Sequence, residues 1–228
     1  MTHWKPDGAT QQPFPGAYPA LVVALDDPEG LGRVRVRFPW SADDGAGYEA
    51  WARTAVPFAG ANRGAWWIPD VDDEVLVVFA FGDPSQPCVV GSLWNGQDAP
   101  PEEMDSSQNN DLKVIASRTG VKITIDDASG GSRLKLETPA GQSIHIDDES
   151  QSVEVRDASG NVVKLDSSGV TVTASAQVKV EAGTVEVNAG MVTVNAGMSK
   201  FSGVVQADTV IANSVISTSY TPGAGNIW

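Results

Sequence analysis

Along the first hundred residues, apolar positions come in short runs and alternations that predict β-strands. Residues 20–25 form an apolar run, which ends at the turn-forming stretch 26–30. Three apolar residues then alternate with three arginines, and this period of two buries one face and presents guanidinium groups on the other. The alternation pairs Val34, Val36 and Phe38 with Arg33, Arg35 and Arg37. Further strands are predicted at 53–56, 66–68, 74–81 and 89–93. Because no window has helical periodicity, these short strands with Gly, Pro and Asp between them predict a small barrel over residues 17–97.

Residues 95–111 are polar, contain proline and are aperiodic, and a linker is predicted over residues 98–115. After them, pairs of apolar residues separated by one polar residue recur along the chain. The pairs are Ile123/Ile125, Leu134/Leu136, Ile144/Ile146, Val153/Val155, Val163/Leu165, Val170/Val172, Val178/Val180, Val185/Val187 and Val192/Val194. The steps between their first members are 11, 10, 9, 10, 7, 8, 7 and 7 residues. One short strand and one turn per repeat are typical of a solenoid or prism, here over residues 116–198.

The repeats need a place to bury their apolar face. Each strand offers only two inward side chains, so one chain cannot enclose a core with them. Three chains around a common axis can do so, each supplying one wall, and a homotrimer is therefore predicted. The predicted trimer core comprises Ile144, Ile146, Val153, Val155, Val170, Val172, Val178, Val180, Val185, Val187, Val192 and Val194.

The last thirty residues, 199–228, have a different pattern. Residues 207–211 (ADTVI) are echoed by residues 212–216 (ANSVI), which suggests tight rungs that continue the repeats. The chain then ends on a large aromatic residue. Tyr220, Ile227 and Trp228 are predicted to form either a hydrophobic plug or a contact for another protein, and the sequence leaves these two alternatives open.

Composition separates the two halves of the chain. Aromatic residues are concentrated before residue 98, and only Phe201, Tyr220 and Trp228 come later. The first half can therefore fill an ordinary aromatic core, whereas the second must bury small β-branched side chains. The net charge of −14 disfavours nucleic acid as a partner, because binding to phosphate needs clustered Lys and Arg.

The sequence predicts a protein that folds in the cytoplasm. Residues 1–16 contain no apolar run of the kind found in a signal peptide and are predicted to be a flexible arm. No stretch reaches the roughly 18 apolar residues that a membrane-spanning helix needs. The single cysteine, Cys88, excludes an intramolecular disulfide, and its apolar neighbours favour a buried, inert thiol.

The residues that could carry catalysis are few. Of the two histidines, His3 lies in the arm and His145 faces away from its apolar neighbours, which favours a surface role over a catalytic base. Asp126-Asp127 and Asp147-Asp148 fall between repeats, where turn formation is favoured over a calcium site. We therefore expect no catalytic site, metal site or cofactor. The three arginines of residues 33–37 either lie on a solvated edge or pair with acids of a neighbouring copy.

The chain resembles the VgrG and phage baseplate assembly protein V family. The resemblance lies in strings whose order and spacing hold over residues 20–97, and it continues in the repeats after residue 120 and in the closing YTPGAGNIW. The strings are GRVRVRFPW at 32–40, WAR at 51–53, AG at 59–60, WIP at 67–69, DEVLV at 73–77, FGDP at 81–84 and GSLWNG at 91–96.

This resemblance implies an all-β protein: an N-terminal OB-type barrel followed by an intertwined trimeric β-prism or β-helix needle. It also implies a structural spike at the baseplate of a contractile, phage tail-like injection machine, which meets the target membrane only transiently. Because only a short arm precedes the barrel, the hub of full VgrG proteins is expected to be a separate partner. Residues 97–115 leave no room for the lysozyme domain that some spikes insert.

Two further expectations follow from the resemblance. Some family spikes bind iron at the tip through a His-X-His pair from each chain, but residues 199–228 contain no histidine or cysteine. A separate PAAR-type tip protein or effector is therefore the expected partner at the C-terminal end.

Two functions are alternatives to the structural spike. One is a trimeric tail-fibre adhesin, whose aromatic residues would be expected at the other end of the chain. The other is a cell-wall-degrading spike, which would need an acid/base pair.

Overall fold

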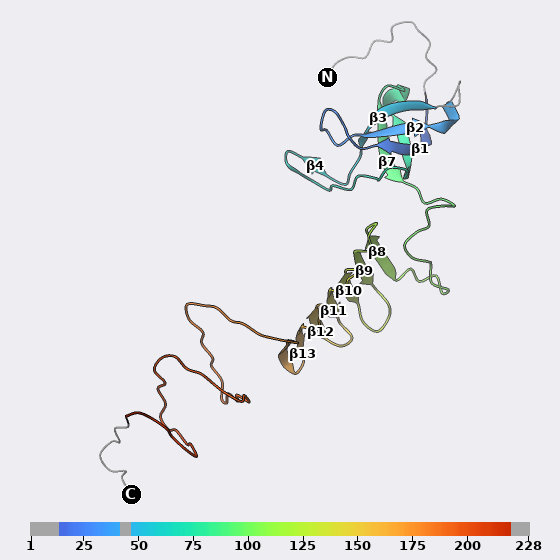
Figure 1. Ribbon diagram of the computed structural model, residues 1–228. Coiled ribbons are helices and arrows are strands. Elements are labelled where there is room, and N and C mark those ends of the chain that lie inside the picture. The colour runs from blue at the N-terminus through green and yellow to red at the C-terminus, as the bar shows by residue number, and fades with distance from the viewer. Residues whose placement is uncertain (1–13, 42–46, 220–228) are drawn as a thin grey trace. The chain divides into compact units, whose positions relative to one another are not determined.

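The computed structural model describes residues 14–41 and 47–219 of the chain, and the first part of it is a closed five-stranded barrel (Figure 1). The order around the barrel is β1-β2-β3-β7-β6, with β6 returning to β1. Strands β3 and β7 are parallel and every other pair is antiparallel. The strands are β1 (Ala17–Ala24), β2 (Val34–Phe38), β3 (Tyr48–Thr54), β6 (Glu74–Phe79) and β7 (Pro87–Ser92).

The barrel core follows from the period-two alternation. In β2, the apolar residues are buried and the arginines between them are partly or fully exposed, as the sequence predicts. Val75, Val77 and Phe79 of β6 alternate in the same way. Closing the sheet brings these inward faces together into one apolar cluster. Its members are Ala20, Val22, Val34, Val36, Phe38, Ala52, Val75, Val77, Phe79 and Val89.

Aromatic rings close one side of this cluster. The ring centroids of Phe38 and Phe79 lie 5.4 Å apart, and Phe14 lies 5.4 Å from Phe79. Trp40 packs beside them and donates a hydrogen bond from Nε1 to the carbonyl oxygen of Pro19, at 3.2 Å. Phe14 falls within the arm predicted over residues 1–16, so the last part of that segment packs on the barrel. Residues 1–13 lie outside the described residues.

The connection between β3 and β6 differs from the prediction. It contains a short hairpin of β4 (Ala59–Gly60) and β5 (Arg63–Gly64), but residues 66–68 form no strand. Trp66 and Trp67 are 77% and 62% exposed. Three consecutive apolar residues suggested a strand there, but the segment has no neighbouring strand with which to pair. The strand predicted at 74–81 also ends early, because a 3₁₀ turn, η2, occupies Ala80–Gly82.

The second part of the chain is a seven-stranded antiparallel sheet in which each strand pairs with the next along the sequence (Figure 1). Every strand has five residues. They are β8 (Leu112–Ala116), β9 (Lys122–Asp126), β10 (Arg133–Glu137), β11 (Ser143–Asp147), β12 (Ser152–Arg156), β13 (Val162–Asp166) and β14 (Gly169–Thr173). Because strand length is constant, the step between apolar pairs sets the turn length: a step of 11 leaves six residues between β9 and β10, and a step of 7 leaves two between β13 and β14.

Residues 178–219 belong to a separate unit, in which no strand or helix is formed. The prediction of one strand per repeat therefore fails within a single chain from Val178 onward. Val178, Val180, Val185, Val187, Val192 and Val194 are 61–69% exposed. A strand needs a hydrogen-bonded neighbour, and in these residues the single chain provides none.

Over residues 14–41 and 47–219, the structure contains no helix of the length and apolarity needed to cross a membrane.

Candidate assembly face

The antiparallel register of the sheet gathers the apolar pairs on one face. Residues that lie directly opposite each other in neighbouring strands project to the same side. The pairing aligns Ile125, Leu134, Ile146, Val153, Leu165 and Val170 in one row, and Ile123, Leu136, Ile144, Val155, Val163 and Val172 in a second row. We call these twelve residues the apolar face. Two unbroken rows of branched side chains thus cross six strands.

The apolar face is not a core in the single chain. Exposure is 39% at Ile144 and 38% at Ile146, and it rises to 68% at Val170. By contrast, the barrel residue Val36 is fully buried. A contiguous apolar surface of this kind on a soluble protein marks a contact with another protein.

The opposite face of the sheet is polar, and ion pairs connect its strands. Arg133 of β10 lies between acids of both neighbouring strands: its guanidinium is 3.6 Å from a carboxylate oxygen of Asp126 and 3.2 Å from one of Asp147. It also contacts Glu149 in the next turn. His145 lies on this face, opposite Lys135 on one side and Glu154 on the other, which confirms that it points away from its apolar neighbours. These pairs favour the native register, since a slip by one residue would exchange the two faces.

All six turns of the sheet are closed by a side-chain oxygen that accepts a backbone N–H of the turn. In the five-residue turns the first residue does this: Asp157, for example, accepts from Ser159 at 2.9 Å and from Asn161 at 2.8 Å. In the other turns it is the aspartate that ends the preceding strand. These turn closers are Ser117, Asp126, Thr138, Asp147, Asp157 and Asp166.

In three of the turn closers, Asp147, Asp157 and Asp166, these bonds lower the pKa of the carboxyl group. The hydrogen bond from the Ser150 N–H, with a further contribution from Arg133, lowers the pKa of Asp147. The Ser168 hydroxyl, donating at 2.5 Å, holds the pKa of Asp166 well below its usual range. Asp126 and Asp147, the first residue of each predicted Asp-Asp pair, therefore accept turn N–H groups with their carboxylates, whereas Asp127 and Asp148 donate their backbone N–H groups to Asp111 and Ser132. No cluster of three or more potential metal ligands is present among residues 14–41 and 47–219.

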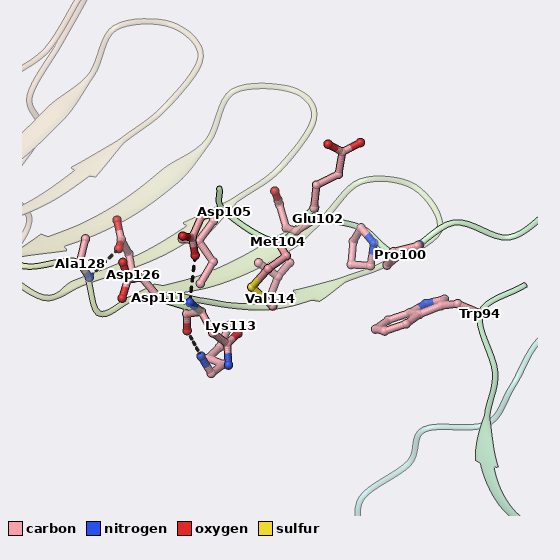
Figure 2. A pocket seen from close by; sticks show the side chains of 14 residues that line it. Trp94, Pro100, Glu102, Met104, Asp105, Asp111, Lys113, Val114, Asp126 and Ala128 are labelled. Carbon is pink, nitrogen blue, oxygen red and sulfur yellow. Dashed lines mark hydrogen bonds between the residues drawn. The ribbon is translucent and has the colours of Figure 1, made fainter. Parts of the chain in front are cut away.

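The first strand of the sheet is out of phase with the others. In β8, Lys113 occupies a position in the row of Ile125, while Leu112 and Val114 fall on the polar side. The preceding segment lies over part of that side, where Pro100, Met104 and Val114 line a hollow of about 680 Å³ (Figure 2).

The segment over β8 is itself folded. The carboxylate of Asp105 accepts the backbone N–H groups of Ser107, Asn109 and Asn110 at 2.9–3.1 Å, and the bond from Asn109 contributes most to lowering its pKa. Lys122 of β9 contacts Glu102. The predicted linker at 98–115 therefore contains an ordered turn and the whole of β8 except Ala116. Leu112 and Val114 have the same alternation as the other repeats, 11 residues before Ile123/Ile125, and could have been included on that signal.

Two of the three arginines of residues 33–37 pair with acids of their own chain. The guanidinium of Arg33 lies 2.7 Å from Asp27 and 3.1 Å from Glu29, and Arg35 lies 3.4 Å from Glu49. Intrachain pairing is a third arrangement, besides the solvated edge and the contact with a neighbouring copy that the sequence suggested.

The predicted assembly residues fall into three groups. Ile144, Ile146, Val153, Val155, Val170 and Val172 lie together on the apolar face, which also contains six residues outside the predicted core. Val178–Val194 are exposed and unpaired in the single chain. Tyr220, Ile227 and Trp228, predicted to form the tip, lie outside the described residues. The six additional face residues have the same alternation as the others and could have been included on that signal.

Comparison with known families agrees with this division into barrel and sheet. Residues 18–94 match the "Type VI secretion system/phage-baseplate injector OB domain", which coincides with the five-stranded barrel. Residues 133–198 match the "Phage baseplate V C-terminal trimerisation domain", which covers β10–β14 and the residues that follow. The two matches together cover more than half of the chain. The chain belongs to the phage baseplate V family.

Curated relatives of this baseplate V protein are VgrG proteins. Type VI secretion system spike protein VgrG1b of Pseudomonas aeruginosa is 29% identical over 126 residues, which cover 52% of this chain and 17% of that protein. VgrG1a of the same organism is 29% identical over 147 residues (58% and 23%). The actin cross-linking toxin VgrG1 of Vibrio cholerae is 27% identical over 149 residues (61% and 13%). The chain spans less than a quarter of the length of these relatives.

The family assignment supports a structural role in a type VI secretion or phage baseplate assembly. It confirms the predicted family, the all-β class and the OB-type barrel. A trimerisation domain also accounts for an apolar face that the single chain leaves open.

Proposed function

We propose that this protein is the central spike of a contractile injection machine and acts as a homotrimer without enzymatic activity. Force from contraction of the surrounding machine would drive the spike through the target envelope. The residues that carry this role are those of the apolar face, because a spike needs a stiff stem and no reactive group.

The observation that carries the proposal is the exposed double row of branched side chains. Each chain supplies one complete sheet with one apolar face and one polar, ion-paired face. Three such sheets can turn their apolar faces to a common axis and leave their polar faces in water. Burying side chains of this size contributes roughly 1.5–3 kcal/mol each before entropy is considered.

The mass of the purified protein tests the trimer. Light scattering should give about three times the chain mass of 23.9 kDa, and this mass should persist on dilution. A folded, stable monomer would contradict the proposal, since the apolar face would then be exposed to water without a partner.

The barrel is proposed to attach the spike to a separate hub or baseplate protein. The connection between β3 and β6 carries three exposed aromatic residues, Phe58, Trp66 and Trp67, at 61%, 77% and 62% exposure. Large exposed aromatic side chains are typical of protein contacts. Trp66→Ser combined with Trp67→Ser should abolish incorporation of the spike into particles and leave its own trimer mass unchanged. Normal incorporation would exclude this surface.

The C-terminal end is proposed to carry a PAAR-type tip protein or an effector. Residues 199–228 contain none of the histidines or cysteines with which a tip could hold a metal. Tyr220, Ile227 and Trp228 would instead provide an apolar platform for a cap. Removing residues 221–228 should leave the trimer intact and abolish co-purification of the cap and delivery of cargo. If the truncated spike still injects at the normal level, the platform is only a plug.

A further inference from the structure

We propose that β8, the first strand of the sheet, is a docking site for a partner protein that adds a short extended segment to its free edge. In this segment a large apolar side chain, which inserts into the hollow beside Val114, is flanked by lysine or arginine. The hollow lies on the polar side of the sheet, away from the apolar face, so the site stays open in the proposed trimer. The inference goes beyond the spike function and does not require it.

The first observation is that β8 has a neighbouring strand on one side only. It is the end strand of the sheet and pairs with β9. Directly after β8, the Ser117 N–H donates to the carbonyl oxygen of Val121 at 2.8 Å, which fixes the phase of the bonds to β9. Because residues of an antiparallel pair alternate between bonded and non-bonded positions, every second residue of β8 directs its N–H and C=O groups to the free edge. These residues are Leu112, Val114 and Ala116.

The free edge is uncovered. Within the part of the chain that the structure describes, these three residues take part in no backbone–backbone hydrogen bond. Four of the five residues of β8 are exposed. Natural sheets protect their edge strands with charges, prolines or bulges, but the side chains that β8 directs to the polar side are those of Leu112 and Val114. An open strand edge of this kind is a template to which an extended peptide can add.

The second observation is the hollow, which gives an added strand a place for a side chain. Pro100 and Met104 line it from the preceding segment, and Leu112 and Val114 line it from β8 (Figure 2). Its volume of about 680 Å³ is typical of ligand sites in proteins. Met104 is 62% exposed and Leu112 is 42% exposed, so apolar surface remains to be covered. Since alternate side chains of a strand project to the same side, a strand added to β8 directs every second residue toward the hollow.

The third observation is the charge around the hollow. Five carboxylates and a single lysine line it. Two of these carboxylates, those of Glu103 and Asp111, take part in no ion pair among the described residues. Complementary charges set the specificity of protein contacts and speed association. The segment that fits this site therefore has basic residues on both sides of its apolar side chain.

The basic segment comes from another protein, because the segments of this chain that have the required pattern are already in use. Apolar residues alternate with two or more basic residues at 33–38 (RVRVRF) and at 133–136 (RLKL). The first stretch contains β2, in the barrel, and the second lies in β10, in the middle of the sheet. Neither can leave its own sheet to pair with β8.

A synthetic peptide tests the site in the full-length protein. The probe is the fluorescent peptide Lys-Val-Lys-Leu-Lys-Val-Lys, and the control is the same peptide with glutamate in place of lysine. Fluorescence anisotropy should show binding of the lysine peptide, and the glutamate peptide should bind at least about tenfold more weakly. Equal binding of the two peptides, or no binding of either, would overturn the inference.

Three variants locate the binding. Glu103→Lys should weaken binding of the lysine peptide several-fold, and Met104→Lys should abolish it by placing a positive charge in the hollow. Both positions are exposed and lie outside the strands, so both variants should keep the mass and the circular dichroism of the unmodified protein. Asp148→Lys, an exposed acid in the turn after β11, is the matched control and should bind normally. The same loss in all three variants would mean that the peptide responds only to net charge, and would exclude this site.

Amide hydrogen exchange tests the backbone contact residue by residue. Without the peptide, Leu112, Val114 and Ala116 should exchange fast, whereas Lys113 and Ile115, which bond to β9, should exchange slowly. A saturating concentration of the lysine peptide should slow the first three and should have no such effect in Met104→Lys. Slow exchange of these three before the peptide is added would mean that the protein itself covers the edge, and would refute the docking site. Fast exchange that persists with the peptide bound would refute strand addition. The mass of the protein tests the proposed trimer separately, so that the two proposals can fail independently.

Discussion

At the residue scale, acidic side chains act as structural parts of this protein. The turn closers fix where the sheet turns, and Asp27 does the same in the barrel. Its carboxylate accepts the backbone N–H groups of Leu31 and Arg33 at 2.8 and 3.1 Å, and it pairs with the Arg33 guanidinium. This guanidinium, with the backbone N–H groups, holds the pKa of Asp27 well below its usual range. A net charge of −14 thus includes many acids with a defined local role.

Asp27 makes stability depend on pH in the acid range. Its folded-state pKa lies below its ordinary value of 3.8, so its contribution is present above that value and is lost as the pH falls toward the folded-state pKa. Asp27→Asn should lower the unfolding midpoint at pH 7, and the difference from the unmodified protein should shrink as the pH falls below about 4. Urea unfolding at several pH values measures this. The exposed neighbour Asp26→Asn is the charge-matched control, and a difference that is constant with pH would refute the assignment.

The barrel core gives a second prediction at this scale. Phe38 is fully buried among aromatic rings, whereas Phe81 is 98% exposed. Phe38→Ala should therefore cost about 3–5 kcal/mol of unfolding free energy. Phe81→Ala should stay within about 0.5 kcal/mol. Unfolding followed by tryptophan fluorescence compares the two, and similar losses would mean that the aromatic cluster does not form the core.

At the element scale, each strand of the sheet has one side for water and one for assembly. The register of β10–β14 keeps every polar residue on one face, where Arg133 links three carboxylates, and every apolar pair on the other. An antiparallel sheet with one solvated face is stable only if its apolar side is covered. The two faces should therefore respond very differently to the same substitution.

Adjacent residues of β11 test this difference. Ile144→Asp would place three charges around one axis, at a cost of several kcal/mol per unpaired buried group. His145→Asp would add a carboxylate to the solvated face opposite Lys135. We expect Ile144→Asp to lose the trimer by light scattering and part of its strand signal by circular dichroism, because the uncovered sheet is unstable, and His145→Asp to remain a trimer. Equal effects would show that the apolar face is not the trimer contact.

At the scale of the whole molecule, the chain divides into parts that depend differently on other copies. The barrel has its own core, the sheet has a complete hydrogen-bond ladder but an open face, and residues 178–219 have neither. Dependence on assembly therefore increases along the chain.

The last of these parts gives a prediction at the scale of the whole molecule. Val187→Asp should lower the melting temperature of the trimer far more than Glu186→Lys, because only Val187 continues the apolar alternation. The former introduces three buried charges, whereas a surface exchange stays within about 0.5 kcal/mol. Differential scanning calorimetry of the two variants measures this. The same melting temperature for both would mean that the inward and outward faces are reversed.

The sequence by itself determined which residues share a face. In β9–β14, the two apolar residues of each strand are read directly from the period of two, and the structure then shows that each strand has five residues. The same alternation predicted β2 and the apolar face. The period also predicted that His145 lies on the polar side, because successive strand residues project to opposite sides.

Only the tertiary structure decided which strands have partners. The apolar alternation is as clear at Val185/Val187 as at Val163/Leu165, yet the first pair lies in unpaired chain and the second in a ladder. Likewise, Trp66–Ile68 has strand-like composition without a neighbouring strand, and only the pairing of β8 with β9 decides that Leu112 and Val114 lie on the polar side of the sheet. Side-chain periodicity is a property of one segment. Hydrogen-bond pairing needs two segments brought together by turn chemistry or by another chain, and this information is not local.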